Sequence, residues 1–166
     1  MTHLDHAADL ADLCRRVGAS IIQIHGDIPV REMSRLRKIN PNFTVIKSLI
    51  VKQENRDALL SAVERWAPWV DVFITDPYDP LTGASGATGK THDWEVSRVL
   101  VARSLKPVIL AGGLNPDNVA PAIRAVRPWG GIVIPASRVV AGEKIMVLFG
   151  PLSSTHRRRF RSGSVK

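Results

Sequence analysis

The sequence predicts an α/β fold built from parallel strands and helical connections, and three observations support this class. Short runs rich in Val and Ile alternate along the chain with longer segments in which apolar residues recur at helical spacing. The longer segments have ten or more residues, the length that a helical crossover between neighbouring parallel strands requires. Polar residues and glycines follow the apolar runs, where open doubly wound sheets and closed barrels both bind ligands. The pattern therefore predicts the class and leaves these two architectures open.

The chain begins with a predicted helix and a predicted strand. Apolar residues at helical spacing extend from Leu4 to Val17, and Gly18 follows as a stop signal. The run from Ser20 to Gly26 is short and rich in isoleucine, which indicates a buried strand that ends in a turn.

The same alternation continues along the chain. We expect helices over residues 29–38, 54–66, 93–104 and 116–126, and strands over residues 43–51, 70–76 and 107–111. A glycine-rich loop extends from Asp76 to about His92. Asn115 and Pro116 suit the start of the last helix, because asparagine is a good N-cap and proline is tolerated in the first turn.

Charge divides the chain into two parts. The net charge is +8, and residues 131–166 hold seven Lys or Arg against one acid, which gives +6 and leaves about +2 for residues 1–130. We therefore expect a nearly neutral domain over residues 1–130 and a divergent basic tail over residues 131–166. Nucleic-acid binding through residues 157–161 is the least favoured function, and it would depend strongly on salt.

Whole-chain features also argue against several classes of protein. The single cysteine, Cys14, permits no internal disulfide and fits a cytoplasmic location; its place on the apolar face of the first helix favours core packing over reactivity. No apolar run reaches the roughly 18 residues of a membrane helix. No cluster of His, Cys and carboxylates has metal-ligand spacing. We expect neither a metal nor a membrane partner.

Two groups of residues at strand ends are candidates for chemistry. Gly112 and Gly113 precede a helix start, where backbone N–H groups and the helix dipole can bind a phosphate, although a simple tight turn is equally consistent with the pair. Asp76 ends an apolar strand and can act as a general acid or base, or merely brace a loop. His25 and Lys47 also stand at strand ends, with substrate contact and structural roles both open.

The segment from Ser85 to Thr91 superficially resembles a nucleotide-binding P-loop. The match fails because Ala84 stands where that pattern needs glycine. Its glycines, including Gly89, still allow the backbone to pack closely over a substrate.

Five motifs in this order resemble the phosphoribosylanthranilate isomerase family. They are Ile22-Gln23-Ile24-His25-Gly26-Asp27, Thr44-Val45-Ile46-Lys47, Phe73-Ile74-Thr75-Asp76, Gly86-Ala87-Thr88-Gly89-Lys90-Thr91-His92-Asp93-Trp94, and Pro107 through Val119. The resemblance covers roughly residues 2–130. It implies the C-terminal portion of a (β/α)8 TIM barrel of the ribulose-phosphate-binding type, with about strands four to eight present.

The resemblance also implies an activity and a set of site residues. The family catalyses the Amadori rearrangement of N-(5-phosphoribosyl)anthranilate in tryptophan biosynthesis, an aldose–ketose isomerisation that uses no cofactor. Asp76 corresponds to the family's general acid at the end of strand six. Gly112 and Gly113 correspond to half of its phosphate cradle, which Asn115 adjoins, and His25 and Gly89 are further candidates for substrate binding.

Parts of the family's site have no counterpart in this sequence. The general base is a cysteine on strand one, and an arginine that recognises the anthranilate carboxylate follows strand two; both would precede Met1, and Cys14 on its helix cannot substitute. The second half of the phosphate cradle is also absent after Gly130. A reading-frame change explains this, because Gly131 to Arg138 can encode Asp-x-His-Thr-Gly-Val-Glu in a shifted frame. We therefore expect an incomplete chain with doubtful activity of its own.

Two other functions stay open. The chain could be a different enzyme on the same phosphate-binding barrel, which binding of the anthranilate-type substrate would distinguish. It could also be a non-catalytic fragment that associates with itself or with a partner, because a few parallel strands cannot close a barrel and leave open edges.

Overall fold

The computed structural model describes residues 4–52, 54–78, 94–133 and 145–148. Within this part of the chain, helices and strands alternate as predicted as far as α5, and two further strands follow. The helices are α1 (Ala7–Val17), α2 (Val30–Ile39), α3 (Arg56–Trp66), α4 (Trp94–Arg103) and α5 (Val119–Val126). The strands are β1 (Ile21–Ile24), β2 (Thr44–Val51), β3 (Val72–Pro77), β4 (Val108–Leu110), β5 (Gly130–Val133) and β6 (Ile145–Leu148).

The strands form one sheet in the order β1-β2-β3-β4-β5-β6. Neighbours from β1 to β5 are parallel, which confirms the class predicted from the helical crossovers. β6 instead pairs with β5 in antiparallel orientation, from Gly130↔Leu148 to Val133↔Ile145. We did not predict β6, because its residues fall in the segment assigned to a divergent tail. The expected boundary after residue 130 falls inside β5, and residues 134–144 and 149–166 lie outside the described part.

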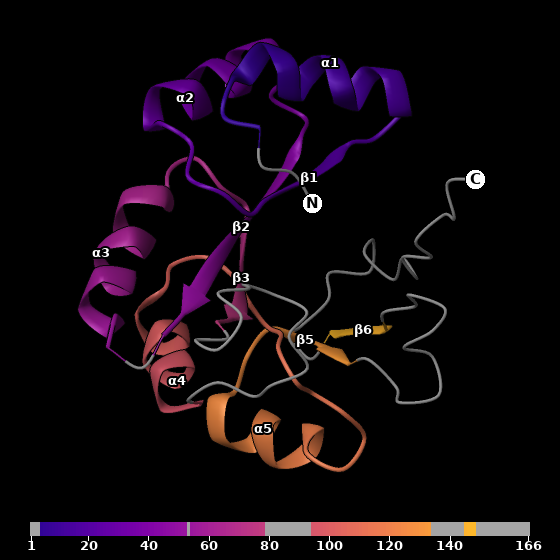
Figure 1. The fold of residues 1–166 in the computed structure, drawn as a ribbon. Helices are drawn as coiled ribbons and strands as arrows, with labels where there is room; N and C mark the ends of the chain where they lie inside the picture. Colours follow the sequence, from indigo (N-terminus) through magenta and orange to yellow (C-terminus); the bar gives the residue numbers. More distant parts are fainter. Residues whose placement is uncertain (1–3, 53, 79–93, 134–144, 149–166) are drawn as a thin grey trace.

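The two faces of the sheet pack differently. On one face, Phe73 shares a core with helical residues such as Leu36 of α2 and Leu100 of α4. On the other face, Ile74 and Ile109 belong to a separate cluster that contains no helical residue among those described. The helices accordingly form an arc around one side of the strands (Figure 1). An open doubly wound sheet would carry helices on both faces, so this arrangement does not resemble one.

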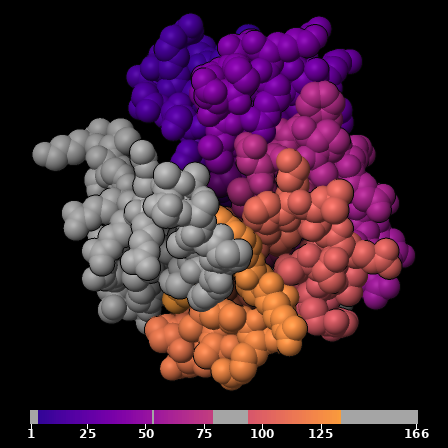
Figure 2. Space-filling view, turned by 180° about the vertical axis from the view of Figure 1, so that it is seen from behind, coloured from indigo at the N-terminus to yellow at the C-terminus, as the bar shows by residue number. Residues whose placement is uncertain are grey.

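The chain follows that arc in sequence order. Seen from behind, the surface changes from indigo at the N-terminal helices, through magenta, to orange at α5 on the opposite end (Figure 2). Neighbouring elements therefore account for most of the packing, as expected for successive βα units. No helix in the described residues is both long enough and apolar enough to cross a membrane.

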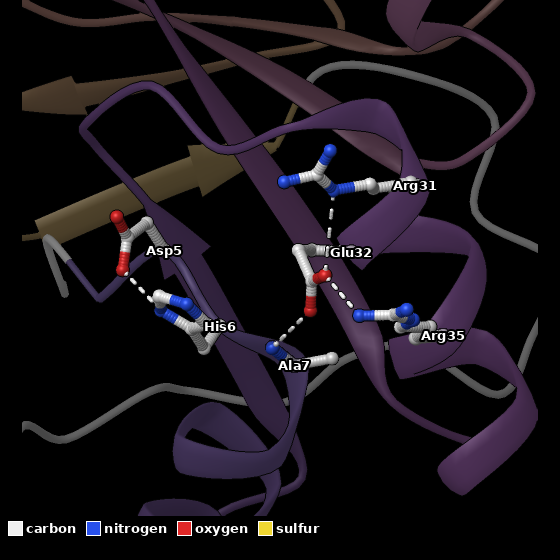
Figure 3. Close-up of polar contacts among 6 residues, drawn as sticks. All are labelled: Asp5, His6, Ala7, Arg31, Glu32 and Arg35. Carbon is white, nitrogen blue, oxygen red and sulfur yellow. Dashed lines mark hydrogen bonds and ion pairs between the residues drawn. The ribbon is translucent and has the colours of Figure 1, made fainter.

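A side chain from the neighbouring helix marks the start of α1. The helix begins at Ala7, three residues later than predicted, and His6 has extended backbone angles. The Ala7 N–H donates to Oε2 of the buried Glu32 at 3.1 Å, so that a carboxylate from α2 caps α1 (Figure 3). The Glu32 Oε1 accepts a hydrogen bond from Arg35 at 2.6 Å, and Arg31 lies 3.8 Å away. The hydrogen bond from Ala7 lowers the pKa of Glu32, and Arg35 adds to the effect.

Glycine ends α1, as predicted. Gly18 has φ 66° and ψ 25°, and its N–H donates to the carbonyl of Arg15 at the end of the helix. This left-handed conformation is the usual termination by glycine.

The last helix starts later than its sequence signals suggest. α5 begins at Val119 and not at Pro116. Asn115 nevertheless caps the preceding turn, because its Oδ1 accepts hydrogen bonds from the backbone N–H groups of Asp117 at 2.9 Å and Asn118 at 3.1 Å. In the opposite direction, the Asn115 N–H donates to Oδ1 of Asn118 at 2.8 Å. This reciprocal pair resembles a capping box. It fixes the turn from Asn115 to Asn118, which directly precedes α5.

Candidate functional site

A cluster of buried polar side chains lies at the carboxyl ends of β1, β2 and β3. Nδ1 of His25 lies 3.3 Å from Oγ of Ser48 and 3.4 Å from Oδ2 of Asp76. Nε2 of Gln23 donates to the same Ser48 Oγ at 3.1 Å. The exposed fractions of His25, Ser48 and Asp76 are 5%, 2% and 8%. The parallel strands thus bring two predicted residues, His25 and Asp76, into one cluster.

Strand register explains why these side chains meet. Ser48 is level with Ile74, so its side chain shares the sheet face that packs without helices. Gln23 pairs with Ile46, which lies two residues before Ser48 in β2 and therefore on the same face. Residue types alone did not single out Gln23 and Ser48, because a polar residue in a strand becomes meaningful only when the face it occupies is known.

Asp76 has an oxygen that is available for chemistry. Its Oδ2 is buried and has no hydrogen-bond partner among the described residues, although His25 lies nearby at 3.4 Å. A buried acceptor without a partner is costly, and a ligand that donates a hydrogen bond or exchanges a proton there would relieve that cost. The arrangement can therefore hold or deliver a proton at the carboxyl edge of the sheet.

The Lys47 side chain leaves β2 from the other face of the sheet. It is level with Phe73, whose side chain belongs to the helix-facing core. Its Nζ donates to the Ser48 carbonyl at 2.9 Å and lies 5.9 Å from the centre of the Trp66 ring. Burial lowers the pKa of Lys47, against the opposing attraction of Asp27 and Asp76. It also lines a cavity of about 490 Å³, and His25 and Ser48 of the cluster line the same cavity.

The glycine pair after β4 stands beside Asp76. The Ala111 N–H donates to Oγ1 of Thr75 at 3.1 Å, which ties the residue before Gly112 to the residue before Asp76. Gly112 and Gly113 have φ angles of 104° and 63°, in the region that favours glycine. The positive φ angles thus require glycine at both positions. A tight turn and an anion cradle would both have this requirement.

The turn that follows the glycines is firmly held. Nδ2 of Asn118 donates to the Gly113 carbonyl at 2.9 Å, and Asn115 caps the turn as described above. The side chains of Asn115 and Asn118 therefore hold this turn in one conformation.

Three other sequence predictions have different outcomes. Gly89 and the glycine-rich loop around it lie outside the described residues. Cys14 is buried in the core, as expected, and burial raises the pKa of its thiol, which makes it less reactive. Across the described ranges, no group of three or more His, Cys, Asp or Glu side chains could hold a metal ion.

Comparison with known proteins gives a consistent result. The family model described as N-(5'phosphoribosyl)anthranilate (PRA) isomerase matches residues 5–133. The chain is 39% identical over 130 residues to N-(5'-phosphoribosyl)anthranilate isomerase 2 of Methanosarcina mazei, covering 78% of this chain and 56% of that protein. It is 41% identical over 127 residues to the Haloferax volcanii isomerase, covering 76% and 52%. The chain thus spans little more than half the length of these relatives.

Solved structures agree with the sequence comparisons. The phosphoribosyl anthranilate isomerase of Thermococcus kodakaraensis matches with a TM-score of 0.59 at 26% identity, over 80% of this chain and 61% of that one. The isomerase of Pyrococcus furiosus matches with a TM-score of 0.60 at 24% identity, over 81% and 60%, and supports the fold alone.

Proposed function

This chain belongs to the N-(5'-phosphoribosyl)anthranilate isomerase family, and we propose that it carries part of the active site for that isomerisation in tryptophan biosynthesis. The substrate is N-(5-phosphoribosyl)anthranilate, a phosphorylated sugar joined to an aromatic acid, and the reaction takes place in the cytoplasm without a cofactor. The observation that carries this proposal is the buried Asp76 carboxylate at the carboxyl edge of the sheet, beside His25 and the Gly112 turn.

We further propose that β1 to β5 correspond to about strands four to eight of a (β/α)8 barrel. The parallel order of these strands supports this assignment, as does the placement of the helices on one face. A barrel of this kind needs additional strands on the other side of β1, which has a neighbour on one side only among the described strands. The face that carries His25 and Asp76 would then point into the barrel.

Asp76 acts as the general acid in this proposal. Opening of the ribose ring leaves a developing alkoxide that needs a proton, and a carboxyl group within hydrogen-bond reach can supply it. His25 lies 3.4 Å from Asp76 Oδ2 and acts as a positioning residue for that carboxyl. Ser48, and Gln23 through Ser48, hold the imidazole in place.

The substrate phosphate would bind at the turn after β4. Gly112 and Gly113 let the backbone approach an anion, and Asn115 fixes the turn that follows them. This turn supplies half of a cradle, and we propose that Gly89 belongs to a loop that covers the substrate. The general base and the group that recognises the anthranilate carboxylate would come from segments beyond this chain, so that the chain alone has little activity.

Among the described strands, β1 has a neighbour on one side only, and this favours one second function. A strand with one unpaired side can add a strand from another molecule. The chain would in that case work as an association module, either with itself or with a complementary fragment, and binding without catalysis would identify this role. A different enzyme on the same phosphate-binding barrel is a third candidate, and failure to bind the anthranilate-type substrate would indicate it.

Consumption of phosphoribosylanthranilate by four proteins tests the proposed reaction. They are the 166-residue chain, the chain restored with upstream strands and the alternative C-terminal frame, and the restored chain with Asp76→Asn or Asp57→Asn. Asp57 is an exposed carboxylate on α3, which makes its variant a matched control. We expect activity only in the restored protein and the control, with Asp76→Asn lowering turnover about 10²- to 10⁴-fold.

Two results would contradict this reasoning. Near-normal turnover by the 166-residue chain would show that no further segment is needed. Undiminished turnover in Asp76→Asn would remove the proposed acid and leave family membership unaffected.

A further inference from the structure

A second cavity lies at the end of the sheet opposite Asp76. Its volume is about 500 Å³, which is within the usual range for a small-molecule site. Its walls include Val101 of α4, Ile123 of α5, and the segments that lead into β4 and β5. α4 and α5 are neighbours at the C-terminal end of the arc of helices (Figure 1). The site is therefore separate from the carboxyl edge where we place the isomerisation.

The charged residues that line this cavity are all positive. Lys106 and Arg127 contribute an ammonium and a guanidinium, and no Asp or Glu is among the lining residues. Neither cation takes part in a salt bridge within the described part of the chain. From residue 96 to residue 133 the sequence has a single acid, Asp117, and it lies in the turn after β4 at the other end of that strand. An anion entering the cavity would thus meet two cations and no carboxylate among the lining residues.

Arg127 holds an unfavourable backbone conformation at this position. It ends α5 with φ 53° and ψ 49°, and among the described residues it is the only one other than glycine with a positive φ. Its N–H donates to the Ile123 carbonyl at 2.8 Å. Glycine would take this place in the helix with less strain. The chain thus places a guanidinium at the cavity despite a backbone cost, and such strain often accompanies a binding role.

Trp129 lines the cavity and also packs against the cluster of Ile74 and Ile109. Trp129 is half-buried, and its backbone N–H donates to the Val108 carbonyl at 2.9 Å, which fixes the residue beside β4. Pro128 and the aliphatic side chains from α4 and α5 make the remaining wall mainly apolar. A planar ring can pack against such a wall, whereas a strongly hydrated phosphate dianion would lose much of its hydration there.

We propose that this cavity is a binding site for a small aromatic carboxylate. The ring lies against Trp129 and the apolar wall, and the carboxylate pairs with Arg127, whose planar fork of donors matches its two oxygens. Lys106 adds a second positive charge at the same mouth. The site is independent of the proposed isomerase activity, because none of its residues belongs to the Asp76 cluster.

Titration calorimetry with two matched probes tests this site on the full 166-residue chain. The probes are 2-naphthoate and 2-naphthamide, which share a ring system and differ in charge. We expect the native chain to bind 2-naphthoate more tightly than 2-naphthamide. Arg127→Gly should weaken 2-naphthoate about tenfold, the loss typical of one charge-assisted pair, while changing 2-naphthamide by less than about twofold.

Thermal unfolding and a control variant distinguish binding from damage to the fold. Arg127→Gly relieves the backbone strain, so its Tm should rise by about 2 to 4 °C while its affinity falls. Arg124→Ala removes an equal charge from the same helix at an exposed position outside the cavity lining, and it should leave both affinities nearly unchanged. The proposal is overturned if the native chain binds both probes equally or binds neither. Equal losses in the Arg124 and Arg127 variants would also overturn it, because they would indicate diffuse charge attraction.

Discussion

Replacement of Thr75 by valine should weaken the connection between the Asp76 cluster and the glycine turn. Oγ1 of Thr75 accepts the Ala111 N–H at 3.1 Å, just past the point where backbone pairing between β3 and β4 ends at Ile74↔Ile109. This hydroxyl continues the ladder by one step. Valine has almost the same shape as threonine and lacks the acceptor, so Thr75→Val removes this bond with little change in volume.

The burial of both partners sets the size of the effect. Thr75 is fully buried and Ala111 is 6% exposed, so water cannot readily replace the lost acceptor. A buried donor left without a partner costs about 1 to 3 kcal/mol. We therefore expect Thr75→Val to reduce the free energy of unfolding by about 1 to 3 kcal/mol, without the further cost of a large cavity.

Urea unfolding and amide hydrogen exchange measure this prediction. Thr75→Ser is the matched control, because serine keeps the hydroxyl and loses only a methyl group, at a cost of about 1 kcal/mol. The Ala111 amide should exchange faster in Thr75→Val than in the native chain and should stay protected in Thr75→Ser. The reasoning is refuted if Thr75→Val is as stable as the native chain, or if its Ala111 amide keeps its protection.

Two further predictions concern the glycine turn and the cap on α1. Gly113→Ala places a methyl group at φ 63°, and it should cost about 1 kcal/mol in urea unfolding; no loss would mean that the turn relaxes freely. Because the pKa of Glu32 is lowered from its usual value of about 4.5, the stability from its carboxylate is fully present above that pH and declines as the pH falls toward the lowered pKa. Glu32→Gln should therefore flatten the acid end of the stability profile, and an unchanged profile would contradict the cap.

The alternation of elements could be predicted from sequence because it depends on local signals. Apolar periodicity located the five helices and the first four strands, and Gly18 correctly marked the end of α1. The starts of α1 and α5 were misplaced for physical reasons that local patterns do not contain. α1 is capped by Glu32, which lies 25 residues away, and a reciprocal asparagine turn precedes α5.

The candidate site was predictable only in part. The rule that parallel strands meet at one edge, together with the family resemblance, brought His25 and Asp76 to the same end of the sheet. Ser48 and Gln23 were missed, and Lys47 was left with two possible roles, because register decides which face of a strand a side chain occupies. A shift of one residue in register would exchange those faces.

The antiparallel strand β6 has a consequence for reassembly. Its four residue pairs occupy the outer side of β5. A complementary strand that approaches this edge has to displace Ile145–Leu148, so joining is an exchange and not an addition. Each backbone hydrogen bond between β5 and β6 that breaks is replaced by one between β5 and the incoming strand. The two sets of hydrogen bonds nearly cancel in free energy. The outcome therefore depends on which strand packs its side chains better. Exchange is expected to be slower than docking at the edge of β1 that has no neighbour among the described strands.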